Sequence, residues 1–279
     1  MAMFSDPHTI APLPQNATRV HMLSYQHIYH AGNLADVHKH ALLAWIISYM
    51  TRKEKPLSYL ETHAGRGLYD LTSDAALKTG EAAQGIVKHA DWFAKDHPYA
   101  QVLDAVRALH GPNAYPGSPT IAAELLRDQD DITLAELHPA EADALGDAMI
   151  NYAAQVKQQD GFELAMSRTP PTPRRGLLIC DPSFEVKSDY ENIPDFFAKI
   201  HRRWAVGVLV LWYPILTSGA HVNMIRALKS AIPDGIAHEV SFPPARPGHG
   251  MIGSGLFVVN APYGFAEEAG RLLGQFKKL

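Results

Sequence analysis

Residues 176–184, Gly-Leu-Leu-Ile-Cys-Asp-Pro-Ser-Phe, are the strongest indication of the fold of this chain. Its first five residues contain no polar side chain, which is typical of a central strand buried on both faces of a parallel sheet. Outward from it, further strands are predicted at residues 57–62, 132–136 and 206–212. Helical segments alternate with the strands, at residues 33–50, 118–126, 140–152, 161–167, 190–204 and 218–231. This alternation predicts an open, mostly parallel α/β sheet.

Both ends of the chain and one internal segment depart from that alternation. Strands are predicted at 237–242 and 255–260, and the loop between them leaves no room for a helix, so they must form an antiparallel hairpin before a closing helix at 265–277. Residues 72–110 are alanine-rich and helical, which predicts an inserted helical subdomain at about 70–113. Residues 1–21 hold three prolines and no hydrophobic period. They are expected to be a flexible tail before one domain, residues 22–279.

Composition and charge exclude several classes of protein. Lys and Arg number 25 and Asp and Glu 29, so the net charge is −4 and no global positive field draws the chain onto nucleic acid. Cys180 is the single cysteine, which excludes internal disulfides and multi-cysteine metal sites and fits a reducing compartment. No apolar run reaches the roughly 18 residues of a membrane helix, and no signal peptide is recognisable. We therefore expect a cytoplasmic protein without membrane contact.

Polar residues follow the predicted strands at their carboxyl ends, where ligands bind in open α/β sheets. Strand 57–62 ends in the glycine turn 63–67. Glu136 ends the next strand, and it is either a carboxylate placed to accept both hydroxyls of a ribose or a solvated strand-end acid. Asp160 precedes a short helix, so it is either the N-cap of that helix or a contact to a bound base. The glycine turn alone favours a simple strand-to-helix connection.

The most specific local feature is Asp181-Pro182-Ser183-Phe184, which follows the central strand. An adenine amine is a poor nucleophile because its lone pair is delocalised into the ring. A carboxylate and a backbone carbonyl that accept its N–H bonds could localise this lone pair and then remove the proton. A neighbouring aromatic ring could stack on the base. The alternative is a type I turn with Asp at its first position.

Taken together, these motifs resemble the RlmJ family, which consists of 23S ribosomal RNA adenine-N6 methyltransferases that depend on S-adenosylmethionine. The resemblance covers about residues 22–262. It rests on Met22-Leu23-Ser24-Tyr25-Gln26-His27, His30-Ala31-Gly32-Asn33, Asp36-Val37, Lys39-His40, Tyr59-Leu60-Glu61-Thr62-His63-Ala64-Gly65, Tyr115-Pro116-Gly117-Ser118-Pro119, Glu136-Leu137-His138-Pro139, Asp160-Gly161-Phe162 and Leu211-Trp212-Tyr213-Pro214. It implies a Rossmann-like class I methyltransferase sheet with an inserted helical subdomain.

The resemblance also implies roles for individual residues. Asp181 would be the catalytic residue, the carbonyl of Pro182 would accept from the adenine amine, and Phe184 would stack on the base. The family pattern at this turn is usually Asp-Pro-Pro-Tyr, so this chain keeps the aromatic face and lacks the hydroxyl. The residues that would face the target nucleotide are Tyr25, His27 and Lys39. Those that would line the cofactor, S-adenosyl-L-methionine, are His40, His63, Ser118, Glu136, Asp160 and Gly161.

Two alternatives remain open at this point, and a third, a metal site, is disfavoured. A nuclease or DNA-catabolism protein acting on external DNA would use Asp181 with Glu185 and Lys187, although these acids are four residues apart across one turn. A non-catalytic RNA-binding module would use basic clusters such as Arg174-Arg175 without binding the cofactor. A metal site among the fifteen histidines is not expected, because no cysteine or paired carboxylate accompanies them. We expect a monomer that acts on protein-free or early-assembly 23S ribosomal RNA.

Overall fold

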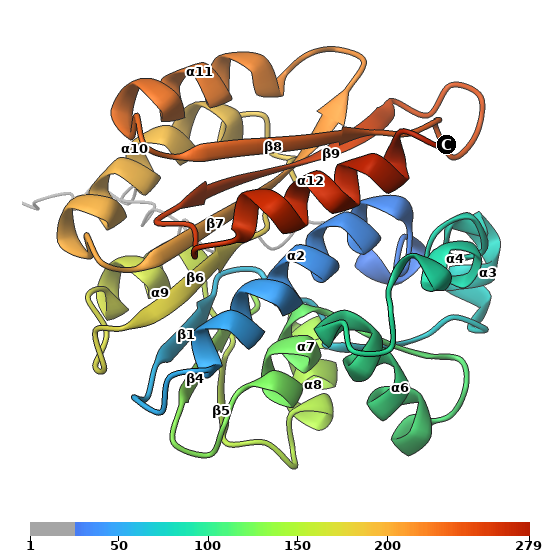
Figure 1. The fold of residues 1–279 in the computed structure, drawn as a ribbon, viewed down its shortest axis with the longest axis horizontal. Coiled ribbons are helices and arrows are strands. Elements are labelled where there is room, and N and C mark those ends of the chain that lie inside the picture. The colour runs from blue at the N-terminus through green and yellow to red at the C-terminus, as the bar shows by residue number, and fades with distance from the viewer. Residues whose placement is uncertain (1–25) are drawn as a thin grey trace, which may run out of the picture.

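A seven-stranded sheet forms the centre of the computed structural model, which describes residues 26–279 (Figure 1). Its strands, in spatial order, are β5 (Ala154–Lys157), β4 (Asp131–Ala135), β1 (Ser58–Glu61), β6 (Gly176–Cys180), β7 (Val208–Leu216), β9 (Met251–Val259) and β8 (Ile236–Ser241). The first five are parallel, and β9 runs antiparallel between β7 and β8. The predicted α/β sheet with its C-terminal antiparallel hairpin is confirmed. The expected tail, residues 1–21, lies outside the described residues.

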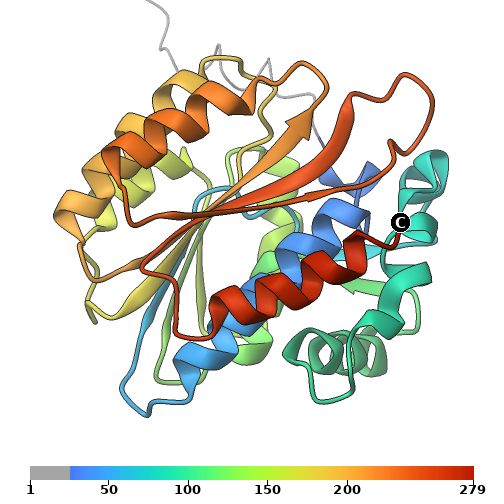
Figure 2. The same cartoon turned by 45° about the horizontal axis from the view of Figure 1, so that its top comes forward.

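Helices cover both faces of the sheet. Side chains alternate between the faces along each strand, and the apolar side chains on both faces must be buried. In β6, Leu177 and Ile179 pack in one core cluster, whereas Leu178 and Cys180 pack in the other. The first cluster includes residues of α2 (Leu34–Thr51), α6 (Pro98–His110), α7 (Ser118–Leu125), α8 (Pro139–Ala148) and α12 (Phe265–Phe276). The second includes residues of α9 (Gly161–Arg168), α10 (Asp189–Arg203) and α11 (His221–Ala231). Figure 2 shows α2 and α12 side by side on one face, with α10 and α11 opposite.

The segment between β1 and α7 is helical, as its sequence predicts. It contains α3 (Asp74–Thr79), α4 (Glu81–Gln84), α5 (Ile86–His89), the 3-10 turn η2 (Ala90–Trp92) and α6. Strands β2 (Leu68–Asp70) and β3 (Ala114–Pro116) pair antiparallel where the segment leaves and rejoins the sheet. These two strands and β5 were not expected from the sequence. Each has only three or four residues, too few for a periodicity to show.

Helix α2 follows the 3-10 turn η1 (His27–Tyr29) and is unusual because polar residues lie buried along it. It begins at an N-cap, Asn33, whose side chain accepts a hydrogen bond from the amide of Asp36. Sheet and helices surround it, so Asp36, His38, Lys39 and His40 are all at most 4% exposed. Buried charges are tolerated when they are paired and hydrogen-bonded. The partners of these four side chains therefore define the interior beside the sheet.

Among residues 26–279, none of the helices combines the length and apolar character needed to cross a bilayer.

Candidate active site

A cavity of about 380 Å³ opens at the carboxyl ends of the central strands, where the sequence predicts ligand binding. The turns after β1, β4 and β6, the start of α9 and the first turns of α2 contribute to its lining. Apart from Tyr25, which lies outside the described residues, every residue singled out for the site lines this cavity. These residues are His27, Lys39, His40, His63, Ser118, Glu136, Asp160, Gly161, Asp181, Pro182 and Phe184.

The turn after β6 presents a carboxylate and an aromatic ring to the cavity. Because side chains alternate along β6, Asp181 points to the same face as Ile179, toward α2. Phe184 has a φ of 56°, a region that bulky residues rarely adopt. Its ring packs against Tyr190, with centroids 4.7 Å apart, and against Trp212 at 6.2 Å. These contacts hold Phe184 in its strained conformation beside Asp181.

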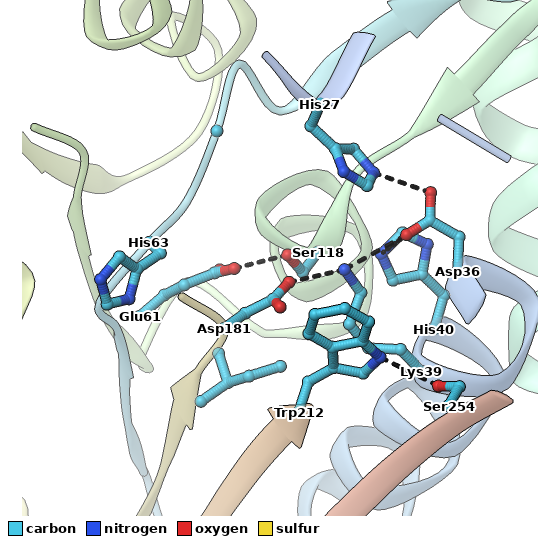
Figure 3. Close-up of polar contacts among 12 residues, drawn as sticks. His27, Asp36, Lys39, His40, Glu61, His63, Ser118, Asp181, Trp212 and Ser254 are labelled. Carbon is cyan, nitrogen blue, oxygen red and sulfur yellow. Dashed lines mark hydrogen bonds and ion pairs between the residues drawn. The ribbon is translucent and has the colours of Figure 1, made fainter. Parts of the chain in front are cut away.

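Asp181 belongs to a chain of charged side chains that runs into α2 (Figure 3). Lys39 Nζ lies 2.6 Å from Asp181 Oδ2 and 3.2 Å from Asp36 Oδ1, and His27 Nε2 lies 2.9 Å from Asp36 Oδ2. Burial alone would lower the pKa of Lys39, but Asp181 and Asp36 outweigh burial and raise it. Burial would likewise raise the pKa of Asp36, but His27, Lys39 and His40 hold it well below its usual range. Lys39 therefore stays a cation between two acids.

His40 is a neutral imidazole in the wall of the cavity. Burial lowers its pKa to about 3, although the neighbouring Asp36 opposes this shift. Its Nδ1 lies 2.8 Å from the hydroxyl of Tyr115, which in turn contacts the hydroxyl of Tyr99 at 3.0 Å. Because these partners lie on β3 and α6, the segment between β1 and α7 fixes the orientation of His40.

A second buried acid, Glu61, ends β1 beneath the cavity. Ser118 donates its hydroxyl hydrogen to Glu61 Oε1 at 2.5 Å, and Tyr59 donates to Oε2 at 2.8 Å. Burial raises the pKa of Glu61 to about 8, against the effect of the two hydroxyl donors. The N-cap of α7 is Gly117, so the hydroxyl of Ser118 is not used to cap the helix. The hydroxyl of Ser118 contacts Glu61 instead.

The other acids at the strand ends shape the backbone of the cavity. Glu136 accepts hydrogen bonds from the amides of Gly65 and His138, each at 2.8 Å, and burial raises its pKa above the ordinary value. Asp160 Oδ1 caps α9 through the amides of residues 162 and 163, so the N-cap interpretation of this residue is confirmed. Asp160 also lines the cavity, so the cap does not remove it from the candidate site.

Gly161 lies where α9 crosses the end of β1. A Cβ atom added to Gly161 would stand 1.8 Å from the carbonyl oxygen of Thr62, so only glycine allows this approach. Next to it, the ring of His63 meets Phe162 edge-on, with centroids 5.0 Å apart, and His63 Nδ1 lies 2.7 Å from Thr62 Oγ1. Helix α9 is therefore held tightly against the turn after β1.

Sequence reasoning assigned no role to three residues that organise this site: Asp36, Glu61 and Trp212. Asp36 precedes Lys39 and His40 by three and four residues on a helix, a spacing that places the three on one face. Glu61 is the one charged residue of the predicted strand 57–62, which is a recognisable signal. Trp212 stands in a continuous apolar run, and nothing local distinguishes it from core.

The site thus has two chemically different parts. One is built of strand-end acids and close backbone turns and includes Glu136, Asp160 and Gly161. The other combines Asp181 with the aromatic side chains of Phe184 and Trp212. Such an arrangement suits a ligand with hydroxyl groups in the first part and a planar group with N–H donors in the second.

Known proteins are similar to this chain in sequence and in fold over most of its length. The family model described as "Ribosomal RNA large subunit methyltransferase D, RlmJ" matches residues 54–278. The chain is 38% identical over 259 residues to "Ribosomal RNA large subunit methyltransferase J" of Escherichia coli (strain K12), covering 90% of this chain and 92% of that protein. It is 36% identical over 248 residues to the protein of the same name from Haemophilus influenzae, covering 87% and 88%.

A solved structure supports the same relationship. The crystal structure of a protein from Legionella pneumophila str. Philadelphia 1 superposes with a TM-score of 0.80 at 32% identity, covering 89% of this chain and 93% of that one. The sheet is the Rossmann-like class I methyltransferase sheet that the resemblance implied. The nuclease alternative finds no support in any of these comparisons. With a family model that spans residues 54–278 and two relatives above 30% identity, this chain belongs to the RlmJ family of large-subunit ribosomal RNA methyltransferases.

Proposed function

We propose that this protein transfers a methyl group from S-adenosyl-L-methionine to the N6 amine of an adenine in 23S ribosomal RNA. The observation that carries the proposal is the position of Asp181 at the mouth of the sheet, with aromatic rings beside it and a cavity lined by acids behind it. The two methyltransferase relatives carry large-subunit ribosomal RNA in their names. The adenine and its N6 amine come from the family resemblance and from the chemistry that Asp181 can perform.

The cavity fits the proposed cofactor. Glu136 can accept the two hydroxyls of a ribose, and Asp160 with the amide of Gly161 can contact the adenine ring. His40, His63 and Ser118 line the remainder of the cofactor region. When bound, S-adenosylmethionine supplies a sulfonium-activated methyl group, so the protein has mainly to place the acceptor in line with it.

Asp181 prepares the acceptor. One oxygen of its carboxylate is held by Lys39, so the other can accept an N–H bond from the adenine amine, together with the carbonyl of Pro182. These two acceptors localise the lone pair of the amine, and Asp181 takes the proton after the methyl group has been transferred. Phe184 provides a face for stacking on the base. The target base must leave its own stack to reach this turn.

The substrate side of the proposal extends to the residues around Lys39. We assign Tyr25, His27 and Lys39 to the target nucleotide; His27 and Lys39 line the same cavity as Asp181. Protein-free or early-assembly 23S ribosomal RNA is the proposed substrate, since an adenine in naked RNA is easier to extrude than one covered by ribosomal proteins. A cytoplasmic monomer is the proposed form of the enzyme.

The test is transfer of labelled methyl from S-adenosylmethionine to protein-free 23S ribosomal RNA, with and without EDTA, followed by nucleoside analysis. We expect label in N6-methyladenosine and no effect of EDTA. Asp181→Asn should keep cofactor binding and lose about 10²–10⁴-fold in rate, whereas Asp195→Asn, an exposed residue of α10, should behave as the parent. Magnesium-dependent loss of intact RNA or DNA without label would overturn the proposal, and equal loss of binding and rate in Asp181→Asn would make Asp181 structural.

A further inference from the structure

Trp212 lies beside the proposed catalytic turn and has no part in the mechanism above. Cys180 of β6 is in register with Leu211 of β7, so the residue after each, Asp181 and Trp212, stand at the same level of the sheet. The indole lines the cavity and meets the ring of Phe184 at an interplanar angle of 61°. Lys39 Nζ stands 5.5 Å from its centroid. A planar base that stacks on Phe184 would therefore meet Trp212 edge-to-face, an arrangement that aromatic rings favour.

A buried hydrogen-bond chain holds the indole from behind. Trp212 donates its Nε1–H to Ser254 Oγ at 2.9 Å (Figure 3), and Ser254 lies on β9 with no exposed surface. His38 of α2, also fully buried, places Nδ1 2.8 Å from the same oxygen and Nε2 2.9 Å from His238 Nδ1 on β8. Three elements of the fold thus converge behind one side chain of the cavity wall.

One direction of hydrogen bonding satisfies Trp212, Ser254 and His38 together. Burial and the neighbouring His238 hold the pKa of His38 well below its usual range, so His38 carries a single ring hydrogen. If Ser254 donates to His38 Nδ1, and His38 Nε2–H donates to His238 Nδ1, then the hydrogens of Trp212, Ser254 and His38 each have an acceptor. In the opposite arrangement Ser254 receives two N–H donors, and its own hydrogen has no acceptor among the contacts of residues 26–279. A rotation of the indole would break the chain at its first bond.

We propose that Trp212 is the second aromatic wall of the target-base pocket, and that Ser254, held by His38, is a positioning residue that fixes the plane of the indole. This inference rests on the proposed methyl transfer to an adenine. It assigns capture of the base to Phe184 and Trp212 together, and it assigns Ser254 an effect that passes through Trp212. Replacement of Trp212 should therefore lower kcat/KM for the RNA and leave the affinity for the cofactor unchanged.

The experiment measures steady-state methyl transfer to protein-free 23S ribosomal RNA at saturating S-adenosylmethionine, with cofactor affinity measured separately. An edge-to-face contact between aromatic rings contributes about 0.5–1.5 kcal/mol, so Trp212→Leu should lower kcat/KM for RNA about 2- to 12-fold, mainly through KM. Trp212→Phe should lose less, because it keeps a ring. Ser254→Ala should lose several-fold in kcat/KM, again through KM, with cofactor affinity within twofold of the parent.

A double-mutant cycle shows whether Ser254 acts through Trp212. Because phenylalanine has no N–H to donate, Ser254→Ala should change kcat/KM less than twofold in a Trp212→Phe background. An equal effect of Ser254→Ala in both backgrounds would overturn the positioning role. If Ser254→Ala does not fold, the comparison of Trp212→Phe with Trp212→Leu still tests whether Trp212 is an aromatic wall of the base pocket. An equal loss of kcat/KM in both variants would refute that role. If the parent protein transfers no methyl group, the proposed function itself has failed.

Discussion

Replacement of Glu61 by glutamine should make the stability of this protein less dependent on pH. Glu61 is 1% exposed, and its hydrogen-bond partners are the hydroxyls of Ser118 and Tyr59. Burial raises its pKa from 4.5 to about 8. Since the folded state binds this proton more tightly than the unfolded state, the contribution to stability is fully present below pH 4.5. It is lost as the pH rises through about 8.

The size of the effect follows from that pKa. At about 1.4 kcal/mol per pH unit, the interval from 4.5 to about 8 corresponds to about 5 kcal/mol of unfolding free energy. Roughly 3.5 kcal/mol of this loss falls between pH 5 and pH 8. Glutamine has the shape of the neutral acid and cannot ionise. The free energy of unfolding of Glu61→Gln, minus that of the parent, should therefore grow by about 3.5 kcal/mol over this range.

The assay is urea unfolding of both proteins without cofactor at pH 5, 6, 7 and 8. Other titrating groups, such as the buried His40, contribute equally to both proteins and cancel in the difference. Glu267→Gln, at an exposed position of α12, serves as the matched control and should show a constant difference from the parent. A difference for Glu61→Gln that varies by less than about 1 kcal/mol across this range would refute the reasoning, because Glu61 would then be no more neutral in the folded than in the unfolded state.

Two further predictions concern the residues around the cavity. Lys39→Met should lower the free energy of unfolding by about 3–5 kcal/mol at neutral pH, because Asp36 and Asp181 lose their shared cation. The control Lys187→Met, at an exposed site, should leave the free energy of unfolding unchanged. Equal losses of stability for the two variants in urea unfolding would contradict the role of Lys39. Gly161→Ala should lower the stability of the protein by about 1–3 kcal/mol or more and weaken cofactor binding. Gly146→Ala, where an added Cβ would meet nothing within 4 Å, should raise the stability by up to about 1 kcal/mol. Thermal unfolding measures the stability, and calorimetric titration measures cofactor binding.

Much of the fold could be predicted from sequence because its main elements carry local periodicities. The apolar strand of residues 176–180, the hairpin and the closing helix were all recognised in this way. The strands that were not predicted, β2, β3 and β5, are too short to show a hydrophobic periodicity. Strand β5 also lies at the edge of the sheet, where little of it is buried. Their existence depends on pairing with distant partners rather than on their own residues.

The polar side chains at the ends of strands could be identified from the sequence alone, since a strand ends where its apolar run ends. How these side chains act on one another depends on the packing of distant segments. Lys39 and Asp181 are 142 residues apart, and His38 and Ser254 are 216 apart. These pairs meet because α2 packs along the sheet and β9 inserts between β7 and β8. The raised pKa of Glu61 likewise depends on burial, which is set by packing from several elements at once and not by neighbours in the chain.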